Sequence, residues 1–172
     1  YPEVYGAVYA LSACCLTPTY AQPAAVAKAQ AVQSDSVFAK ADFLTKVLVA
    51  LAAAWSPSPK APPYFELPYK DGTLQPEVMA AWSANAPVAM LNQYVANLKR
   101  IRFIAFDVGL QDGLLAENQR MDRLLADDAI QHTFETYEGT HTSKIGERLE
   151  TKALPFFSKV LSFGPNLPDR DR

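Results

Sequence analysis

Hydrophobic residues along the chain gather in short runs that are typical of strands. Residues 6–11 are almost entirely apolar and lie between a glycine and a serine, which favours a buried strand over a helix. Residues 101–108 form a second run of this kind, which ends at Gly109. In the segment 132–137 polar and apolar residues alternate, which indicates a third strand.

Between and after these runs, apolar residues recur at helical spacing. Pro23 is placed to open a helix that runs to about Gln33. The cluster Ser34–Ser36 offers N-caps for a second helix, whose apolar stripe continues without a break to Trp55. Further helical segments are predicted over 75–98, in short pieces opened by Pro76 and Pro87, around 114–125, and over 145–156, where Pro155 would kink or restart the helix.

The order of these elements predicts an α/β fold in which helices flank parallel strands. Three strands are few for a parallel sheet covered on both faces, so we expect part of a larger sheet. Tyr1 begins a turn that leads directly into the first apolar run, which indicates that a segment precedes it. The edge beside residues 6–11 should then carry unpaired backbone groups. It would be covered by the N-terminal part of the same protein or by self-association.

Composition narrows the function classes. The chain of 172 residues is 49% hydrophobic, which suits a single, partial domain with a real core. A net charge of −2 gives no basic face for nucleic acid. Lys46 interrupts the best candidate for a membrane span. The adjacent Cys14 and Cys15 suit neither a disulfide framework nor a zinc site, and no glycine-rich phosphate loop is present.

The section 20–100, between the first two strands, is helical and proline-rich, and we expect it to form a cap or insertion. Its stretch 56–68 combines prolines with aromatic residues, which favours an irregular loop pinned onto the body. Two interpretations remain open for the aromatic residues of this section: they line an apolar substrate-binding site, or they belong to a core. These residues are Trp55, Tyr64, Phe65 and Trp82.

Two residues with acid–base chemistry follow successive strands. Asp112 comes shortly after 101–108, and His141 comes shortly after 132–137. The carboxyl ends of parallel strands share one edge, and neighbouring strands lie about 5 Å apart, so we expect the two side chains to meet. An acid followed by a histidine is the order of the α/β-hydrolase triad, whose serine comes earlier. Asp112 would orient His141, and His141 would take the serine proton.

Four segments resemble, in order and spacing, the C-terminal part of the esterase D-like family of α/β-hydrolases. YPEVYGAVYALS, at 1–12, resembles the segment that enters the strand after the nucleophile helix, and FDVGLQD, at 106–112, resembles the segment of the triad acid. YEGTH, at 137–141, resembles the segment of the triad histidine, and LPFF, at 154–157, the closing helix. The resemblance implies a serine carboxylesterase that forms an acyl-enzyme with a small ester, without metal or cofactor.

The sequence departs from this family in one respect. The nucleophile motif Gly-x-Ser-x-Gly is absent, so the chain alone is expected to be inactive. Ser12 is interpreted as a hydrogen-bonding strand cap and Ser143 as the N-cap of the last helix, and neither is assigned as the nucleophile. A non-catalytic α/β binding module, and an acyltransferase with the same triad, are the alternative functions.

Each member of the predicted pair also has a simpler interpretation. Asp112 could cap a helix starting near Gly113, and His141 could be an exposed loop residue. Asp107 is the rival acid, but on a strand it should point into or across the sheet. His132 has no acidic motif nearby and is interpreted as structural.

Overall fold

The computed structural model describes residues 1–18, 22–60 and 62–161. The chain divides into two compact units. The sheet unit comprises Tyr1–Cys14 and Asn92–Arg172, and the helical unit comprises Cys15–Leu91. The helical unit largely coincides with the section 20–100, whose role as a cap remains a prediction. The composition of residues 164–172 predicts a frayed end, and these residues lie outside the described part of the chain.

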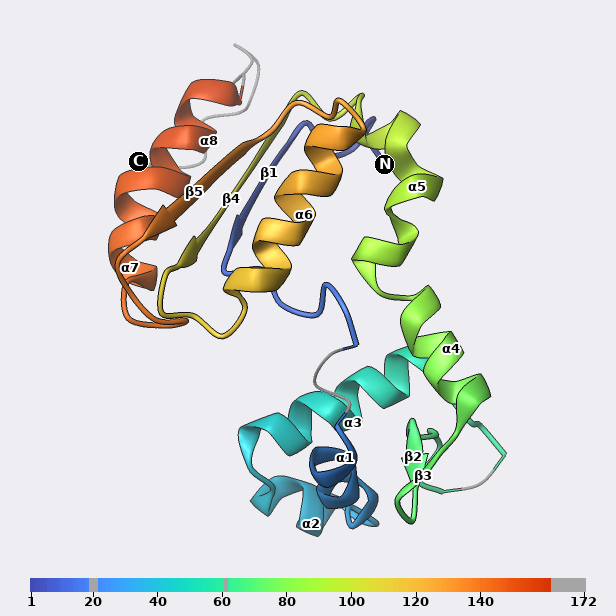
Figure 1. The fold of residues 1–172 in the computed structure, drawn as a ribbon. Coiled ribbons are helices and arrows are strands. Elements are labelled where there is room, and N and C mark those ends of the chain that lie inside the picture. Colours follow the sequence, from blue (N-terminus) through green and yellow to red (C-terminus); the bar gives the residue numbers. More distant parts are fainter. Residues whose placement is uncertain (19–21, 61, 162–172) are drawn as a thin grey trace, which may run out of the picture. The chain divides into compact units, whose positions relative to one another are not determined.

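The sheet unit contains three parallel strands in the order β1-β4-β5 (Figure 1). These are β1 (Ala7–Leu11), β4 (Phe103–Gly109) and β5 (Thr133–Tyr137). The central strand β4 aligns Asp107 with Leu11 on one side and with Glu135 on the other. The structure therefore confirms the three predicted strands and their parallel pairing.

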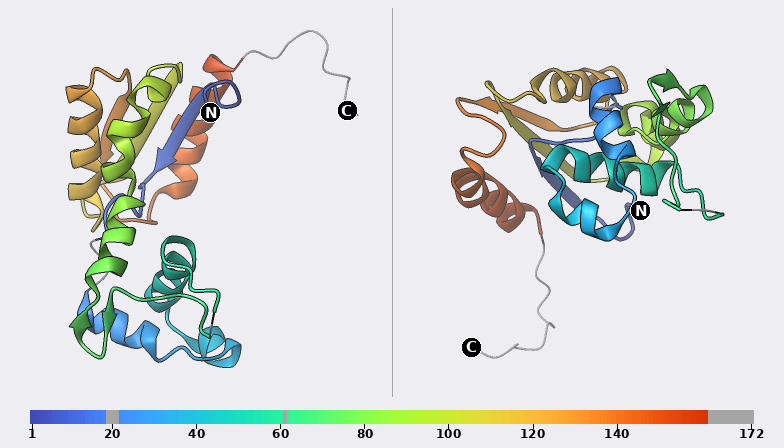
Figure 2. Two further views of the ribbon diagram at one scale, coloured as in Figure 1. Left: turned by 90° about the vertical axis from the view of Figure 1, so that its right-hand side faces the viewer. Right: turned by 90° about the horizontal axis from the view of Figure 1, so that it is seen from below.

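Helices cover both faces of this sheet (Figures 1 and 2). One face carries α6 (Leu115–Asp127). The other carries a continuous helical segment made of α7 (Ile145–Arg148), a π-helical turn over Leu149–Ala153, and α8 (Leu154–Val160). Because β4 is buried on both sides, its sequence is an almost uninterrupted run of apolar residues. The predicted α/β layering is confirmed.

The π-helical turn lies directly before Pro155, where the sequence predicts a kink or restart. Proline has no backbone N–H, so an α-helix would lose its i→i−4 hydrogen bond at this position. The wider turn accommodates that loss, and the helix then resumes as α8.

The helical unit is built from short helices around a compact core. Its elements are α1 (Pro23–Gln30), α2 (Asp35–Lys40), α3 (Phe43–Trp55), α4 (Pro76–Ala84) and the start of α5 (Pro87–Leu98), with a hairpin of β2 (Tyr69–Lys70) and β3 (Thr73–Leu74). Val26, Leu48 and Trp82 are fully buried in the core. Pro23, Pro76 and Pro87 open helices as predicted.

The prediction of one continuous helix up to Trp55 is wrong. The chain breaks at Ala41, whose backbone is extended, and Asp42 caps the new helix α3 by accepting a hydrogen bond from Thr45 N at 2.9 Å. No residue of α2 is buried, so the apolar stripe across the break does not reflect one buried face. The hairpin was not predicted, although its Asp71-Gly72 turn, with φ of 50° and 77°, has a typical hairpin sequence.

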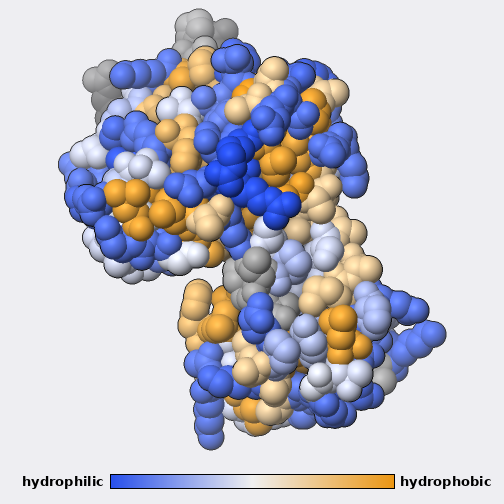
Figure 3. Space-filling model, viewed as in Figure 1, coloured by the Kyte–Doolittle hydropathy of each residue, from blue (hydrophilic) through white to orange (hydrophobic). Residues whose placement is uncertain are grey.

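Strand β1 lies at an edge of the sheet. Within the described part of the chain it pairs with β4 alone, and nearby Tyr5 and Val8 are 59% and 42% exposed. Figure 3 shows further hydrophobic residues at the surface of both units. What covers this edge remains a prediction. Among the described residues, no helix combines the length and apolar character needed to cross a membrane.

Candidate active site

Asp112 and His141 meet beyond the carboxyl ends of β4 and β5. His141 Nδ1 lies 3.0 Å from Asp112 Oδ2, within hydrogen-bond distance. The Asp112 side chain is 1% exposed, whereas that of His141 is 50% exposed. The structure thus brings together the two residues selected from the sequence, with a buried acid behind an accessible imidazole. Their catalytic role remains a prediction.

The second oxygen of Asp112 orders the start of α6. Asp112 Oδ1 accepts a hydrogen bond from Leu114 N at 2.9 Å, and α6 begins at Leu115. This is an Asx turn ahead of the helix, close to the capping role considered for Asp112. The two interpretations of Asp112 are therefore compatible, because each carboxylate oxygen serves one of them.

The environment of Asp112 keeps it ionised. Burial raises the pKa of its carboxyl, but hydrogen bonding from the Leu114 amide, from His141 and from Ser12 outweighs burial and holds the pKa below its usual value. An ionised carboxylate accepts hydrogen bonds and cannot donate them. His141 must therefore carry its proton on Nδ1, which leaves Nε2 as the nitrogen that can take a proton.

Ser12 lies beside Asp112 at the end of β1. Its backbone N–H donates to Asp107 O at 2.8 Å, but its buried hydroxyl makes no hydrogen bond of standard geometry with the described residues. The hydroxyl nevertheless contributes to the low pKa of Asp112, so we interpret it as a loosely aligned neighbour of the carboxylate. The hydrogen bond at the strand end that the sequence predicted for Ser12 is thus made by its backbone N–H, whereas its hydroxyl lies beside Asp112. The φ of 47° at Ser12 places it in the left-handed region.

Ser143 differs from its prediction as well. Its hydroxyl accepts a hydrogen bond from Thr140 N at 2.8 Å and so closes the loop that carries His141. The N-cap of α7 is Lys144, whose side chain makes no capping bond. Ser143 therefore shapes the histidine loop and does not cap the helix.

The rival acid Asp107 has other partners. Its Oδ2 accepts hydrogen bonds from Tyr9 Oη at 2.7 Å, from Arg148 Nε at 2.8 Å and from Arg148 Nη2 at 2.7 Å. Asp107 is fully buried and points across the face of the sheet that carries α7. These contacts leave Asp112 as the partner of His141. The sequence analysis missed Arg148, because only its charge, and no motif, marks it.

His132 does have an acidic partner, contrary to the ground on which the sequence marked it as structural, but its contacts tie elements of the fold together. Its Nδ1 lies 2.8 Å from Ile130 O, and its Nε2 lies 2.9 Å from Asp122 Oδ1. The ring also stacks on Phe106, with centroids 5.9 Å apart. These contacts join the start of β5 to α6.

The four aromatic residues selected as candidates for a substrate site occupy different places in the helical unit. Trp82 is fully buried, donates a hydrogen bond to Ser56 Oγ at 2.8 Å, and meets Trp55 edge-on with centroids 5.6 Å apart. Tyr64 is 59% exposed, and Phe65 is partly buried. The core interpretation fits Trp82, and Trp55 and Phe65 pack against the same core, whereas Tyr64 is accessible. A substrate site among these residues remains a prediction.

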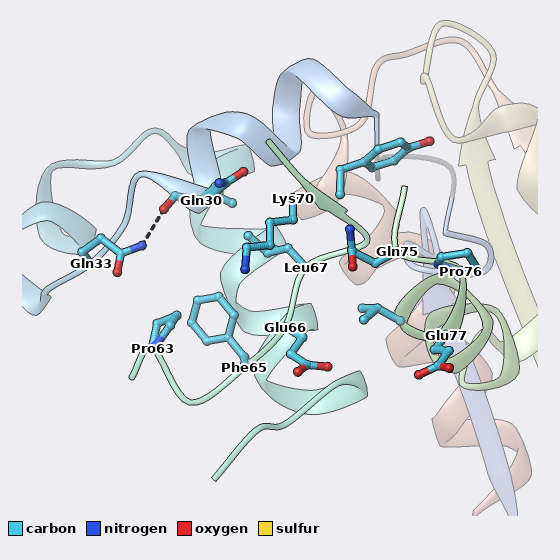
Figure 4. Close-up of a pocket in the computed structure, with 13 residues that line it drawn as sticks. Gln30, Gln33, Pro63, Phe65, Glu66, Leu67, Lys70, Gln75, Pro76 and Glu77 are labelled. Atoms are coloured by element: carbon cyan, nitrogen blue, oxygen red, sulfur yellow. Dashed lines mark hydrogen bonds between the residues drawn. The ribbon is translucent and has the colours of Figure 1, made fainter. Parts of the chain in front are cut away.

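Phe65 also lines a pocket of about 750 Å³ within the helical unit. Figure 4 shows Phe65 and Leu67 near its centre and polar side chains, including Gln33, Lys70 and Gln75, around them. Gln33 Nε2 donates to Gln30 O at 2.7 Å at one side of this pocket. The pocket combines apolar surface with amide groups and with the charged side chains of Glu66, Lys70 and Glu77.

Comparisons with known proteins give little further information. No family model matches the chain. No curated protein matches it either. A solved structure titled ferulic acid esterase is similar to 56% of this chain at 19% identity, with a TM-score of 0.44, and the match spans 38% of that protein. A likeness of this size carries no inference, and the esterase D-like resemblance remains an expectation.

Proposed function

We propose that this chain is the C-terminal part of a serine carboxylesterase of the α/β-hydrolase class, related to the esterase D-like family. The observation that carries the proposal is the contact between buried, ionised Asp112 and accessible His141 at the carboxyl edge of a parallel sheet. This edge is where catalytic groups collect in α/β folds. The acid also precedes the histidine, as in the α/β-hydrolase order.

The proposed reaction proceeds through an acyl-enzyme. A serine oxygen attacks the ester carbonyl while His141 Nε2 takes the serine proton. The imidazolium then returns that proton to the departing alcohol, and the acyl group stays on the serine. Water next attacks the acyl-enzyme and gives a proton to His141, and the imidazolium returns that proton to the serine oxygen as the acyl–serine bond breaks, which releases a carboxylic acid and restores the serine hydroxyl. Asp112 stays ionised throughout and stabilises the imidazolium.

The nucleophile is proposed to come from a segment that precedes Tyr1. The hydroxyl of Ser12 is buried, and the hydroxyl of Ser143 accepts a hydrogen bond from Thr140 N. Neither hydroxyl is therefore placed to attack an ester. A preceding strand could pair with the open edge of β1 and cover the apolar side chains near it. The helical unit would serve as the cap, with its accessible aromatic residues at the acyl group of a small ester.

The test compares the chain with a longer protein that includes the preceding coding sequence. We expect the longer protein to hydrolyse a chromogenic short-chain ester and the chain alone to show neither burst nor turnover. In the longer protein, H141A should lower kcat by about 10³-fold or more and D112N by a similar factor. Thr142→Ala, a change at an exposed residue of the same loop, is the matched control and should keep full activity.

Three results would contradict the proposal. Unchanged turnover in H141A would remove the histidine from the mechanism. Robust ester hydrolysis by the chain alone would show that the serine does not lie upstream. Absence of turnover in the longer protein, with every ester tried, would favour the non-catalytic binding module. Product analysis with an added alcohol acceptor separates hydrolysis from acyl transfer.

A further inference from the structure

Gln111 connects the loop that carries Asp112 to the loop that carries His141. Its side-chain carbonyl accepts a hydrogen bond from Gly139 N at 2.7 Å, and its side-chain NH₂ donates to Glu138 Oε2 at 2.8 Å. Its backbone N–H donates to Gly139 O at 3.0 Å. One residue therefore makes three hydrogen bonds to two consecutive residues of the opposite loop.

These bonds lie next to the catalytic pair in the sequence. Gln111 directly precedes Asp112, and Gly139 lies two residues before His141. The backbone bond from Leu110 N to Tyr137 O, at 2.8 Å, brings the two chains side by side just before this point. Any shift of Gln111 relative to Gly139 would thus change the separation of Asp112 and His141.

The side chain at this position must both donate and accept. The Gly139 N–H requires an acceptor, whereas the Glu138 carboxylate requires a donor. A glutamine amide meets both needs. A glutamate in its place would keep the acceptor but would set two carboxylates against each other.

We propose that Gln111 is a positioning residue that holds the acid loop and the histidine loop in the register in which Asp112 and His141 bond. The importance of this alignment for catalysis rests on the proposed function. The alignment itself does not, because the bond between Asp112 and His141 is measurable in the chain alone. Gln111 touches neither substrate nor reacting atoms and acts through the two residues that it aligns.

The tautomer of His141 provides the readout. A neutral imidazole carries one proton, and the bond to Asp112 requires that proton on Nδ1. In ¹⁵N-labelled chain at about pH 8.5, well above the usual histidine pKa of about 6.5, long-range ¹H–¹⁵N correlation shows which ring nitrogen is protonated. The chain has two histidines, so the ring signals of His141 are identified as those that disappear in H141A.

We expect the Nδ1–H form to dominate at His141 in the unmodified chain and to become the minor form in Q111E. The double variant Q111E/E138Q should restore it, because the new amide at position 138 donates to the new carboxylate at position 111. E138Q alone should keep it. Gln93→Glu, the same charge change at an exposed residue of α5, is the matched control and should leave the tautomer unchanged.

The outcomes separate this inference from the proposed function. Absence of the Nδ1–H form in the unmodified chain would contradict the Asp112–His141 pair itself and with it the proposed function. Its presence there and unchanged dominance in Q111E would overturn the role of Gln111 alone. Should Q111E fail to fold, Q111A is judged by the same criterion, since it removes both side-chain bonds without adding charge.

Discussion

Arg148 and Asp107 form a buried ion pair on the face of the sheet covered by α7 and α8. Arg148 Nη2 lies 2.7 Å from Asp107 Oδ2, and the two side chains are 8% and 0% exposed. Arg148 also reaches Glu135 Oε2 at 2.8 Å, and its guanidinium lies 4.8 Å from the centre of the Tyr137 ring. The pair therefore attaches the helix that follows the His141 loop to strands β4 and β5.

Removing Arg148 should destabilise the sheet unit strongly. In R148M the carboxylate of Asp107 stays buried without its counter-ion, which costs about 3–5 kcal/mol in comparable pairs. Amide hydrogen exchange in β4 measures this loss directly, because β4 lies at the centre of the sheet. Arg120→Met, at an exposed arginine of α6, is the control. Equal protection in R148M and in the unmodified chain would show that the pair contributes little.

The sequence predicted the strands well because each is marked by local features. The apolar run at 101–108 reflects burial of the central strand β4 on both faces of the sheet, whereas the run at 6–11 marks the edge strand β1, none of whose residues is fully buried. The meeting of Asp112 and His141 followed from topology, since both residues come directly after parallel strands. These inferences needed only the order of elements and the geometry common to all parallel sheets.

Contacts between distant side chains could not be predicted in this way. Arg148 and Asp107 are 41 residues apart, and their contact depends on how the last helix crosses the sheet. The bonds of Gln111 depend on the path of two loops that the sequence leaves undetermined. The break at Ala41 was missed because apolar residues continue at helical spacing through it, and only Asp42, an N-cap residue, marks the new start.

Gly109 allows the loops that carry Asp112 and His141 to approach closely. A Cβ atom at this position would lie 2.1 Å from Gly139 O, a backbone atom that cannot turn away. G109A should therefore lower the free energy of unfolding of the sheet unit by about 1–3 kcal/mol, as overpacking does elsewhere. It should also reduce the Nδ1–H form of His141 by separating the loops.

Gly113 provides the matched control for this substitution. A Cβ atom there would meet nothing within 4 Å, so G113A should change stability by no more than about 1 kcal/mol and leave the His141 tautomer intact. Equal behaviour of G109A and G113A, by urea unfolding and by nitrogen shifts, would contradict the close packing of the loops.

Acid should weaken the sheet unit through Glu135. Hydrogen bonds from Arg148 and Lys152 hold the pKa of Glu135 below its usual value of 4.5. A carboxyl whose pKa is lower in the folded state contributes stability that is complete above the unfolded pKa. That contribution is lost as the pH falls below 4.5 and through the folded value.

The variant E135Q tests this sign. It should be less stable than the unmodified chain at neutral pH, and the difference should shrink as the pH falls below about 4.5. Stability is measured by urea unfolding, followed by far-UV circular dichroism, across this range. Glu150→Gln, at an exposed residue of the helical segment that carries Arg148 and Lys152, is the control and should give a constant offset. A difference that grows in acid would contradict the direction of the Glu135 pKa shift.

Trp82 and Tyr64 should respond oppositely to truncation, because one lies in the core of the helical unit and the other is exposed. W82A removes a fully buried side chain and its bond to Ser56, which should cost about 3–5 kcal/mol of the free energy of unfolding. Y64A should change stability by less than about 0.5 kcal/mol. Urea unfolding followed by Trp55 fluorescence measures the first variant, because Trp55 is then the sole tryptophan. A stable W82A would contradict the core position of Trp82.

Tyr64 has a second test in the longer protein. An acyl site that includes Tyr64 predicts that Y64A raises KM without changing stability. An unchanged KM would remove Tyr64 from that site.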